Sequence, residues 1–150
     1  RFQKLYNTFI KNFIKYEFEL DEIIYQKIPT FRVHLKDNQA VGEWHRDRDY
    51  NHGKSEVNIW LPFTDAYDTN TIWIESEEDK NDFKPYNVSY GEVLVFNGAN
   101  LIHGNKTNIE HDTRVSVDFR IVNPTEFIPS TKGSINTNTS FDIGGYFQKL

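Results

Sequence analysis

The segment TRVSVDFRIV, residues 113–122, constrains the fold of this chain more than any other stretch. Read as a β-strand, it alternates polar and apolar side chains with a period of two, so each kind occupies one face. The polar face carries Arg114, Ser116, Asp118 and Arg120. The apolar face carries Val115, Val117, Phe119 and Ile121. The strand therefore separates a polar side from an apolar side, and either can face the interior.

Four more runs of β-branched and aromatic residues follow Pro29, and turn residues bound each of them. They are TFRVHLKD (30–37), SEVNIWLPFTD (55–65), NTIWIES (70–76) and GEVLVFNG (91–98). Short strands separated by turn signals are typical of sandwiches and barrels. We therefore predict an all-β core over about residues 30–123.

The first residues, RFQKLYNTFIKNFIKY, have a different period. Their apolar residues recur at steps of three and four, namely Phe2, Leu5, Tyr6, Phe9, Ile10, Phe13 and Ile14. This spacing predicts an amphipathic helix over about residues 2–16, which we expect to cover a sheet.

Two polar segments show no period. They are ESEEDKNDFKPYN (75–87) and STKGSINTNTS (130–140), which we predict to be loops. Neither favours a domain boundary, and 150 residues suit one domain with one core. We therefore predict a single domain over residues 1–150, with a C-terminal extension at 124–150.

The composition excludes several classes of protein. The chain has no Cys, which excludes disulfides, thiolate metal sites and a Cys nucleophile. Its net charge of -5 argues against a nucleic-acid partner, and no apolar run is long enough to cross a membrane. We expect a soluble, cytoplasmic protein without nucleic-acid or membrane partners. Because the chain starts at Arg1 and has no Met, we also expect natural residues before it, which could form part of the site wall.

The segment EWHRDRDY, residues 43–50, carries the first candidate metal ligands. If it is extended, His45 and Asp47 project from one face, Asp49 shares that face, and Arg46 and Arg48 point away. A His-X-Asp triplet arises often by chance, and a surface hydrogen bond is the more common explanation of such a pair. A third ligand would complete a facial site.

Four other histidines are candidates for that third ligand. His103 follows an apolar strand and the turn FNGAN, where a strand end can direct a side chain inward. His52 and His111 lie in turns and are expected to face solvent. His34 is expected to be a structural histidine. Two His and one carboxylate form the metal site of non-haem Fe(II) oxygenases.

Arg114 and Ser116 form a second candidate site on the polar face of residues 113–122. A guanidinium binds a carboxylate through two hydrogen bonds, and the Ser hydroxyl two residues later adds a third donor. Taken alone, Arg114 is equally well explained as an exposed strand cation.

As an ordered series, these motifs resemble the 2-oxoglutarate/Fe(II)-dependent oxygenase superfamily: WHRDRDY, EVNIWLPFT, NTIWIES, GEVLVFNGANLIHGN and TRVSVDFRIV. The chain looks similar to the phytanoyl-CoA dioxygenase-like group, and most similar to its StrG-like (streptomycin biosynthesis protein) subgroup. The resemblance covers most of the chain from about Phe31 onward and extends to FDIGGYF near the end. It implies a double-stranded β-helix, a jelly-roll or cupin-like barrel with iron at one open end.

The resemblance also implies roles for single residues. The Fe(II) ligands would be His45, Asp47 and His103. Arg114, with Ser116 as a helper, would bind the distal carboxylate of 2-oxoglutarate. Arg120 is the alternative for that role, or else a substrate contact.

Asn58 is a candidate hydrogen-bonding partner of the cosubstrate, although a buried amide satisfied by backbone explains it equally well. Further candidates for substrate contacts are Trp60, Arg32 and Asp49. The reaction implied consumes 2-oxoglutarate and O2, releases succinate and CO2, and hydroxylates a small molecule. A polar metabolite or sugar conjugate is the first choice of substrate, while the oxidised position and the oligomeric state stay open.

Two functions of other classes fit the same barrel. A cupin-like metal-dependent isomerase or epimerase would bind metal without 2-oxoglutarate, but typical cupin sites have more His and a Glu. A non-catalytic carbohydrate-binding jelly roll would use Trp44, Trp60 and Trp73 as stacking platforms. We expect the oxygenase, because its polar residues occur together and in order.

Overall fold

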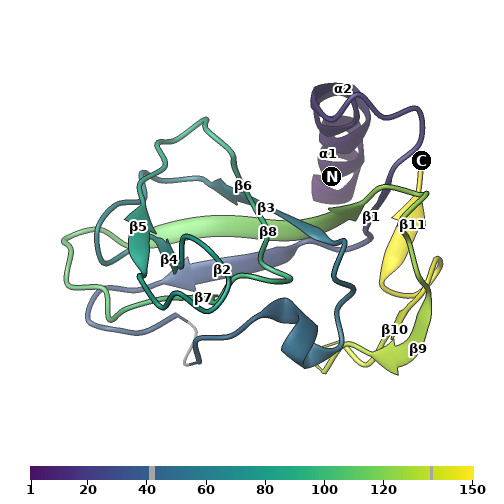
Figure 1. Ribbon diagram of the computed structural model, residues 1–150. Coiled ribbons are helices and arrows are strands. Elements are labelled where there is room, and N and C mark those ends of the chain that lie inside the picture. The colour runs from purple at the N-terminus through teal and green to yellow at the C-terminus, as the bar shows by residue number, and fades with distance from the viewer. Residues whose placement is uncertain (41–42, 136) are drawn as a thin grey trace.

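The computed structural model describes residues 1–40, 43–135 and 137–150, which are mostly β-sheet with one helix at the N-terminus (Figure 1). The helix runs from Phe2 to Glu17, close to the expected range. It consists of α1 (Phe2–Phe9), the π-helical turn η1 (Ile10–Ile14) and α2 (Lys15–Glu17). No helix in the described ranges combines the length and the apolar character that crossing a bilayer requires.

The larger sheet lies against this helix (Figure 1). Its order is β11-β1-β8-β3-β6, and β2 pairs with β8 next to β1. Its strands are β1 (Ile24–Gln26), β2 (Thr30–His34), β3 (Val57–Pro62), β6 (Leu94–Phe96), β8 (Arg114–Val122) and β11 (Phe147–Lys149). With nine residues, β8 pairs with β1 and β2 on one side and with β3 on the other. The alternating segment 113–122 is therefore the central strand.

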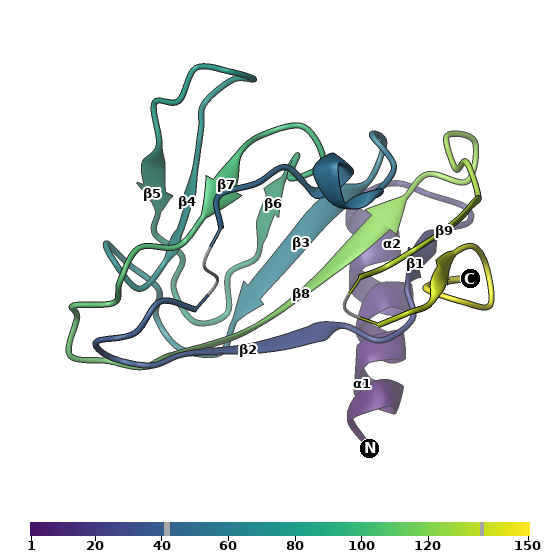
Figure 2. The same cartoon turned by 90° about the horizontal axis from the view of Figure 1, so that it is seen from below.

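The smaller sheet lies near the end of β8 that is remote from the helix (Figures 1 and 2). It contains β5 (Lys84–Tyr86), β4 (Ile72–Ile74) and β7 (His103–Gly104), all antiparallel. An isolated bridge between His45 and His103 extends it by one residue. Two antiparallel sheets in this order form the double-stranded β-helix, so the predicted jelly-roll class is confirmed.

The apolar face of β8 packs against the helix. The buried residues of this core include Tyr6, Ile10, Ile14, Ile59, Phe119 and Ile121. The rings of Tyr6 and Phe119 meet edge-on, with centroids 5.1 Å apart. Because the apolar face is covered in this way, the polar face of β8 points into the space enclosed by the two sheets. The sequence alone left this direction open.

The C-terminal segment is ordered around two further short strands. Strands β9 (Ser130–Gly133) and β10 (Ser140–Phe141) pair with each other, so the prediction of a loop over 130–140 was wrong. Position 136 of that segment lies outside the described residues. A second buried cluster joins this segment to the sheet: Ile24, Val122, Phe141, Tyr146 and Phe147.

The acidic segment 75–87 also differs from its prediction as a loop, because it contains β5. Main-chain pairing of Ile72 with Tyr86 and of Ile74 with Lys84 holds β5 against β4. Such pairing uses backbone groups only, so it needs no alternation of apolar side chains. Strand β1 went unpredicted as well.

The contact between helix and sheet predicts a large difference between two apolar helix positions. Ile10 is fully buried, whereas Leu5 is 63% exposed. Replacement of Ile10 by Ala should lower the free energy of unfolding by about 2–5 kcal/mol, because it leaves a cavity in the core. Leu5→Ala should change it by about 0.5 kcal/mol or less. Chemical denaturation of both variants measures this, and equal effects would contradict the packing described.

Candidate metal centre

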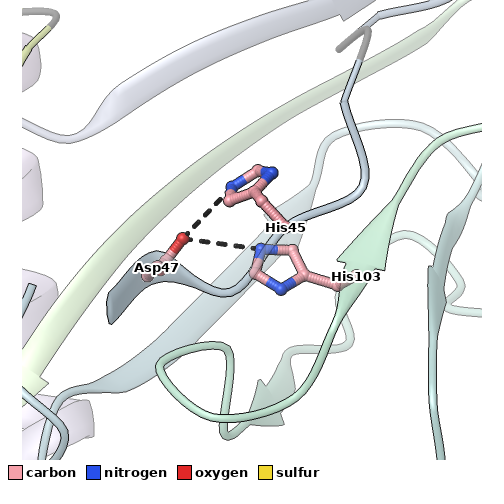
Figure 3. Close-up of side chains that lie close together, drawn as sticks. All are labelled: His45, Asp47 and His103. Carbon is pink, nitrogen blue, oxygen red and sulfur yellow. Dashed lines mark ion pairs between the residues drawn. The ribbon is translucent and has the colours of Figure 1, made fainter. Parts of the chain in front are cut away.

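Three side chains lie close together, one from β7 and two from the segment that precedes β3: His103, His45 and Asp47 (Figure 3). Two main-chain hydrogen bonds between His45 and His103, of 3.0 and 3.1 Å, fix the two histidines side by side. The backbone N–H of Asp47 donates to the carbonyl oxygen of Gly98 at 2.9 Å. Because of these long-range bonds, the site depends on β7 and on the turn that precedes it.

The backbone is extended only as far as Arg46, so the prediction of an extended segment over 43–50 was wrong from Asp47 onward, although His45 and Asp47 do project to the same side. Asp47 begins a short 3-10 helix, η2 (Asp47–Tyr50), which ends at Asn51 with a φ of 72°. Asp49 is exposed, and its carboxylate accepts a hydrogen bond from the N–H of Arg46. Asp49 therefore caps the turn and does not line the cavity next to the ligands.

The two histidines present the same nitrogen to the carboxylate. Nε2 of His45 lies 3.4 Å and Nε2 of His103 lies 3.6 Å from Oδ1 of Asp47. Each Nδ1 lies 3.0 Å from a backbone carbonyl oxygen, that of Glu43 for His45 and that of Leu101 for His103. With Nδ1–H donating to a carbonyl, each Nε2 keeps its lone pair for a metal.

The geometry of these atoms fits a divalent metal. All three potential ligand atoms lie within 4.8 Å of one another. Neighbouring ligands at about 2.1 Å from an octahedral metal would be about 3 Å apart, so small adjustments close the site. Two His and one carboxylate suit iron and related transition metals, and they leave other coordination positions open.

Asp47 is 2% exposed and is held almost entirely through one oxygen. Its Oδ2 accepts hydrogen bonds from Nε of Arg120 at 2.8 Å and from Nδ2 of Asn58 at 2.7 Å, and it lies 2.7 Å from Nη2 of Arg120. Burial opposes ionisation of Asp47, but Arg120 and the neighbouring histidines outweigh burial and hold its pKa well below the usual range. Asp47 is therefore an anion whose Oδ1 faces the histidines.

For each of the two histidines, burial lowers the pKa and the negative charge of Asp47 raises it. Burial lowers the pKa of His103, and the attraction of Asp47 only partly offsets this. For His45, burial also disfavours the cation, but hydrogen bonds to Asp47 and to the carbonyl of Glu43 prevail and raise the pKa. His103 is thus a ready neutral ligand, whereas His45 retains its proton to higher pH.

A cavity opens beside the three ligand atoms. The other polar or aromatic side chains in its wall are Arg32, Asn58, Trp60, Phe96, Asn105, Arg114, Asp118 and Arg120. The structure thus brings together almost all of the site residues predicted from the sequence. Ser116 is not in the cavity wall itself, but its hydroxyl accepts a hydrogen bond at 2.7 Å from Arg114, which is.

Arg114 is buried, with 1% exposure, and its donors face neutral groups. Nε donates to the carbonyl of Asn70 at 3.0 Å, and Nη2 lies 3.2 Å from Nδ1 of His34. Among the described residues, no carboxylate forms an ion pair with it. Burial and the charge of Arg32 lower the pKa of Arg114 to about 10, so it remains a cation at neutral pH. This cavity-lining charge suits an anionic ligand.

The other two arginines in the cavity already have carboxylate partners. Arg32 pairs with Asp118, and Arg120 pairs with Asp47. Asn58, a candidate contact of the cosubstrate, uses its nitrogen on Asp47, while its buried Oδ1 has no partner among the described residues. Asn58 lines the cavity, and a buried oxygen without a partner suits a site that takes up a further ligand.

The remaining histidines divide into two kinds. His34 is fully buried between the carbonyls of Asn70 and Asn38, as a structural histidine. His111 is exposed, as expected. His52 was expected to face solvent, and that was wrong: its side chain is 9% exposed and lies 2.6 Å from Glu56. Its ring also packs against Phe141 of the C-terminal segment.

Sequence reasoning missed the residues that hold the site from outside. Arg46 forms an ion pair with Asp79 and Arg48 forms one with Glu78, so the acidic segment is fastened to the ligand-bearing turn. Tyr146 accepts a hydrogen bond from Arg120. No local pattern marks these contacts, because the partners are separated by more than 25 residues in the sequence.

The raised pKa of His45 predicts that metal binding weakens on acidification. A proton on His45 competes with the metal, so affinity should begin to fall as pH drops through that raised pKa. The fall should approach about tenfold per pH unit and steepen only when His103, with its lowered pKa, also protonates. Titration with Co(II) between about pH 5 and about pH 8 measures the slope. Affinity that does not vary with pH would contradict His45 as a ligand.

Gly98 predicts a second effect, because its missing side chain makes room for Asn58. A Cβ at this position would lie 2.7 Å from Cγ and Nδ2 of Asn58. Gly98→Ala should displace Asn58 from Asp47 and weaken Co(II) binding by about tenfold or more. Gly53→Ala is the control, since its Cβ would meet nothing nearer than 3.4 Å. Equal Co(II) affinities of the two variants would show that Asn58 does not support the ligand.

The comparisons with known proteins agree with this fold. No protein-family model matches the chain. Three solved structures share the jelly-roll fold at TM-scores of 0.52–0.55 and 16–20% identity. AviO1 from Streptomyces viridochromogenes Tue57 covers 76% of this chain, which covers 57% of AviO1. For the non-heme monooxygenase ThoJ, a nickel complex, the shares are 69% and 45%, and for EvdMO1 they are 65% and 27%.

One relative is similar in sequence. The streptomycin biosynthesis protein StrG of Streptomyces griseus is 47% identical over 132 residues, which are 88% of this chain and 63% of StrG. The chain thus spans a little less than two thirds of the length of this relative. At 47% identity over most of its own residues, the chain is a homologue of StrG.

Proposed function

We propose that this chain is an Fe(II)- and 2-oxoglutarate-dependent oxygenase of the phytanoyl-CoA dioxygenase-like group. The observation that supports this most is the position of Arg114. It lines the same cavity as the ligand atoms of His45, Asp47 and His103, and its charge has no carboxylate partner in the described ranges. A metal-dependent isomerase that acts on a neutral substrate would need no such cation beside its metal.

Each group in the cavity then has one task. His45, Asp47 and His103 would hold Fe(II) through two Nε2 atoms and one Oδ1. Arg114 would bind the distal carboxylate of 2-oxoglutarate through the guanidinium, with Ser116 orienting it. Bound iron, 2-oxoglutarate and dioxygen together supply the oxidising power, with release of succinate and CO2.

The walls of the cavity have a different task. Ile72 and Phe96 lie in the wall with Trp60, whose ring is 5.2 Å from the guanidinium carbon of Arg114. These side chains exclude water from the ligand positions and so strengthen the ionic contact to Arg114. The protein would thus orient the cosubstrate and exclude water, while iron and the cosubstrate supply the chemistry.

The substrate we propose is a polar small molecule, with a sugar-containing metabolite as first choice. The side chain of Arg32 is 32% exposed while it pairs with Asp118 in the cavity wall. A partly exposed pair of donor and acceptor can bind hydroxyl groups without leaving a charge unpaired. The name of StrG, a streptomycin biosynthesis protein, supports a metabolite as substrate.

Anaerobic absorption spectroscopy tests the proposal. Addition of Fe(II) and then 2-oxoglutarate without oxygen should produce the visible charge-transfer band of a chelated keto acid. Folded protein that binds Fe(II) but gives no band would favour a metal-dependent isomerase, and folded protein that binds neither would favour a carbohydrate-binding module. Either outcome would refute the oxygenase.

Variants assign the roles of single residues in the same assay. His103→Ala should abolish Fe(II) binding and the band together, because it removes one ligand of three. Arg114→Gln should retain Fe(II) but weaken 2-oxoglutarate binding by about 30-fold or more, since a charged partner is lost. His111→Ala is the control, since this histidine is exposed. Loss of Fe(II) in Arg114→Gln would point to misfolding rather than to the proposed role.

A further inference from the structure

A buried polar network surrounds Arg120 on the side away from the metal ligands. Arg120 is 8% exposed, and Nη1 donates to the hydroxyl oxygen of Tyr146 at 3.0 Å. Its Nε lies 3.9 Å from Oε2 of Glu56, which in turn lies 2.6 Å from Nδ1 of His52. Nη1 also lies 3.4 Å from Oε1 of Gln26 on β1. The guanidinium is thus held by residues from three separate parts of the chain.

The position of Arg120 determines which oxygen of Asp47 is free. Oδ2 accepts one hydrogen bond from Nε of Arg120 at 2.8 Å and one from Asn58 at 2.7 Å, and Nη2 of Arg120 forms an ion pair with it at 2.7 Å. A carboxylate oxygen has two lone pairs, so two donors leave it none to direct at a metal. Asp47 can therefore offer only Oδ1, so the carboxylate would occupy one coordination position instead of two.

Tyr146 brings the C-terminal segment into this arrangement. Its ring packs between Phe141 and Phe147, with centroids 4.9 Å from each. These residues belong to a buried cluster with Val122 at the end of β8 and Ile24 of β1. The described residues of this segment line no part of the cavity, yet the segment is one hydrogen bond away from the residue that holds Asp47.

We propose that Arg120, fixed by Tyr146 of the C-terminal segment, is a positioning residue that makes Asp47 a one-oxygen metal ligand. The inference rests on the metal centre of the proposed function, but not on 2-oxoglutarate or on the substrate. It also assigns Arg120 a task other than binding the cosubstrate, because the carboxylate of Asp47 already neutralises its charge. The C-terminal segment then controls metal affinity from outside the cavity.

Tyr146→Phe is the sharpest variant, because it removes one hydroxyl and keeps the aromatic packing. The apoprotein would be titrated with Co(II), whose visible absorption reports its coordination geometry. Tyr146→Phe should weaken Co(II) binding by about 3- to 10-fold, as expected when one hydrogen bond to a charged group is lost. Arg120→Lys keeps the charge but loses the fork, and it should weaken binding by about 10- to 100-fold and change the absorption bands.

The matched control is Tyr6→Phe. Tyr6 is buried like Tyr146 and its hydroxyl donates to the main-chain carbonyl of Gln26 at 2.7 Å, whereas Arg120 meets only the side chain of Gln26; within the described residues Tyr6 forms no hydrogen bond with Arg120. Tyr6→Phe should lower the thermal midpoint of the apoprotein without changing Co(II) affinity. The double variant Tyr146→Phe, Arg120→Lys should bind Co(II) no more weakly than Arg120→Lys alone, because both act through one contact.

The outcomes separate the inference from the proposed function. Unchanged affinity and absorption bands in Tyr146→Phe, with normal Co(II) binding by the unsubstituted protein, would overturn the inference and leave the metal centre in place. Equal losses of affinity in Tyr146→Phe and Tyr6→Phe would also overturn it, since the effect would then reflect stability alone. Absence of Co(II) binding by the unsubstituted protein would overturn the metal centre and the inference with it.

Discussion

The ion pair between Asp47 and Arg120 is the interaction on which the rest of this structure depends. Both side chains are almost completely buried, and an isolated charge in such a place costs several kcal/mol. Each charge is therefore tolerable only because the other is present. The pair joins the segment 45–50, which carries two candidate metal ligands, to the central strand β8. Loss of either charge would leave the other unpaired in the interior, and would therefore destabilise the fold as well as the site.

Three arginines in one small cavity would repel one another without some means of neutralisation. Asp118 neutralises Arg32 and Asp47 neutralises Arg120, so two of the three charges are satisfied within the fold. Arg114 keeps hydrogen bonds to neutral groups only, and its lowered pKa reflects burial and the nearby charge of Arg32. Within the part of the chain that the structure describes, Arg114 thus remains beside the candidate metal centre as a cation without a carboxylate partner. Incoming anions would find their counter-ion already in position, with little reorganisation required.

The sequence predicted those features that follow from local periodicity. The helix and the main strands of the larger sheet came from it, and so did the common polar face of Arg114 and Arg120. The sequence could not predict that Arg120 has a carboxylate partner and that Arg114 has none among the described residues. Both arginines lie on one strand face, and the partner of Arg120 is Asp47, which is far away in the sequence. The turn at Asp47–Tyr50 and the burial of His52 were missed for the same reason: each depends on contacts to Gly98 or Phe141, far away in the chain. Strand β5 was missed because backbone pairing alone forms it.

The central position of β8 has a consequence for how this protein can change during evolution. Its two faces have different roles over a continuous run of nine residues: one face packs against the helix and the other lines the cavity. Because strand faces alternate with each residue, a single insertion or deletion within β8 would reverse the faces of all strand residues on one side of it, and would so turn Arg114 or Arg120 away from the cavity. Gene variants that alter the length of this strand should therefore be eliminated by selection.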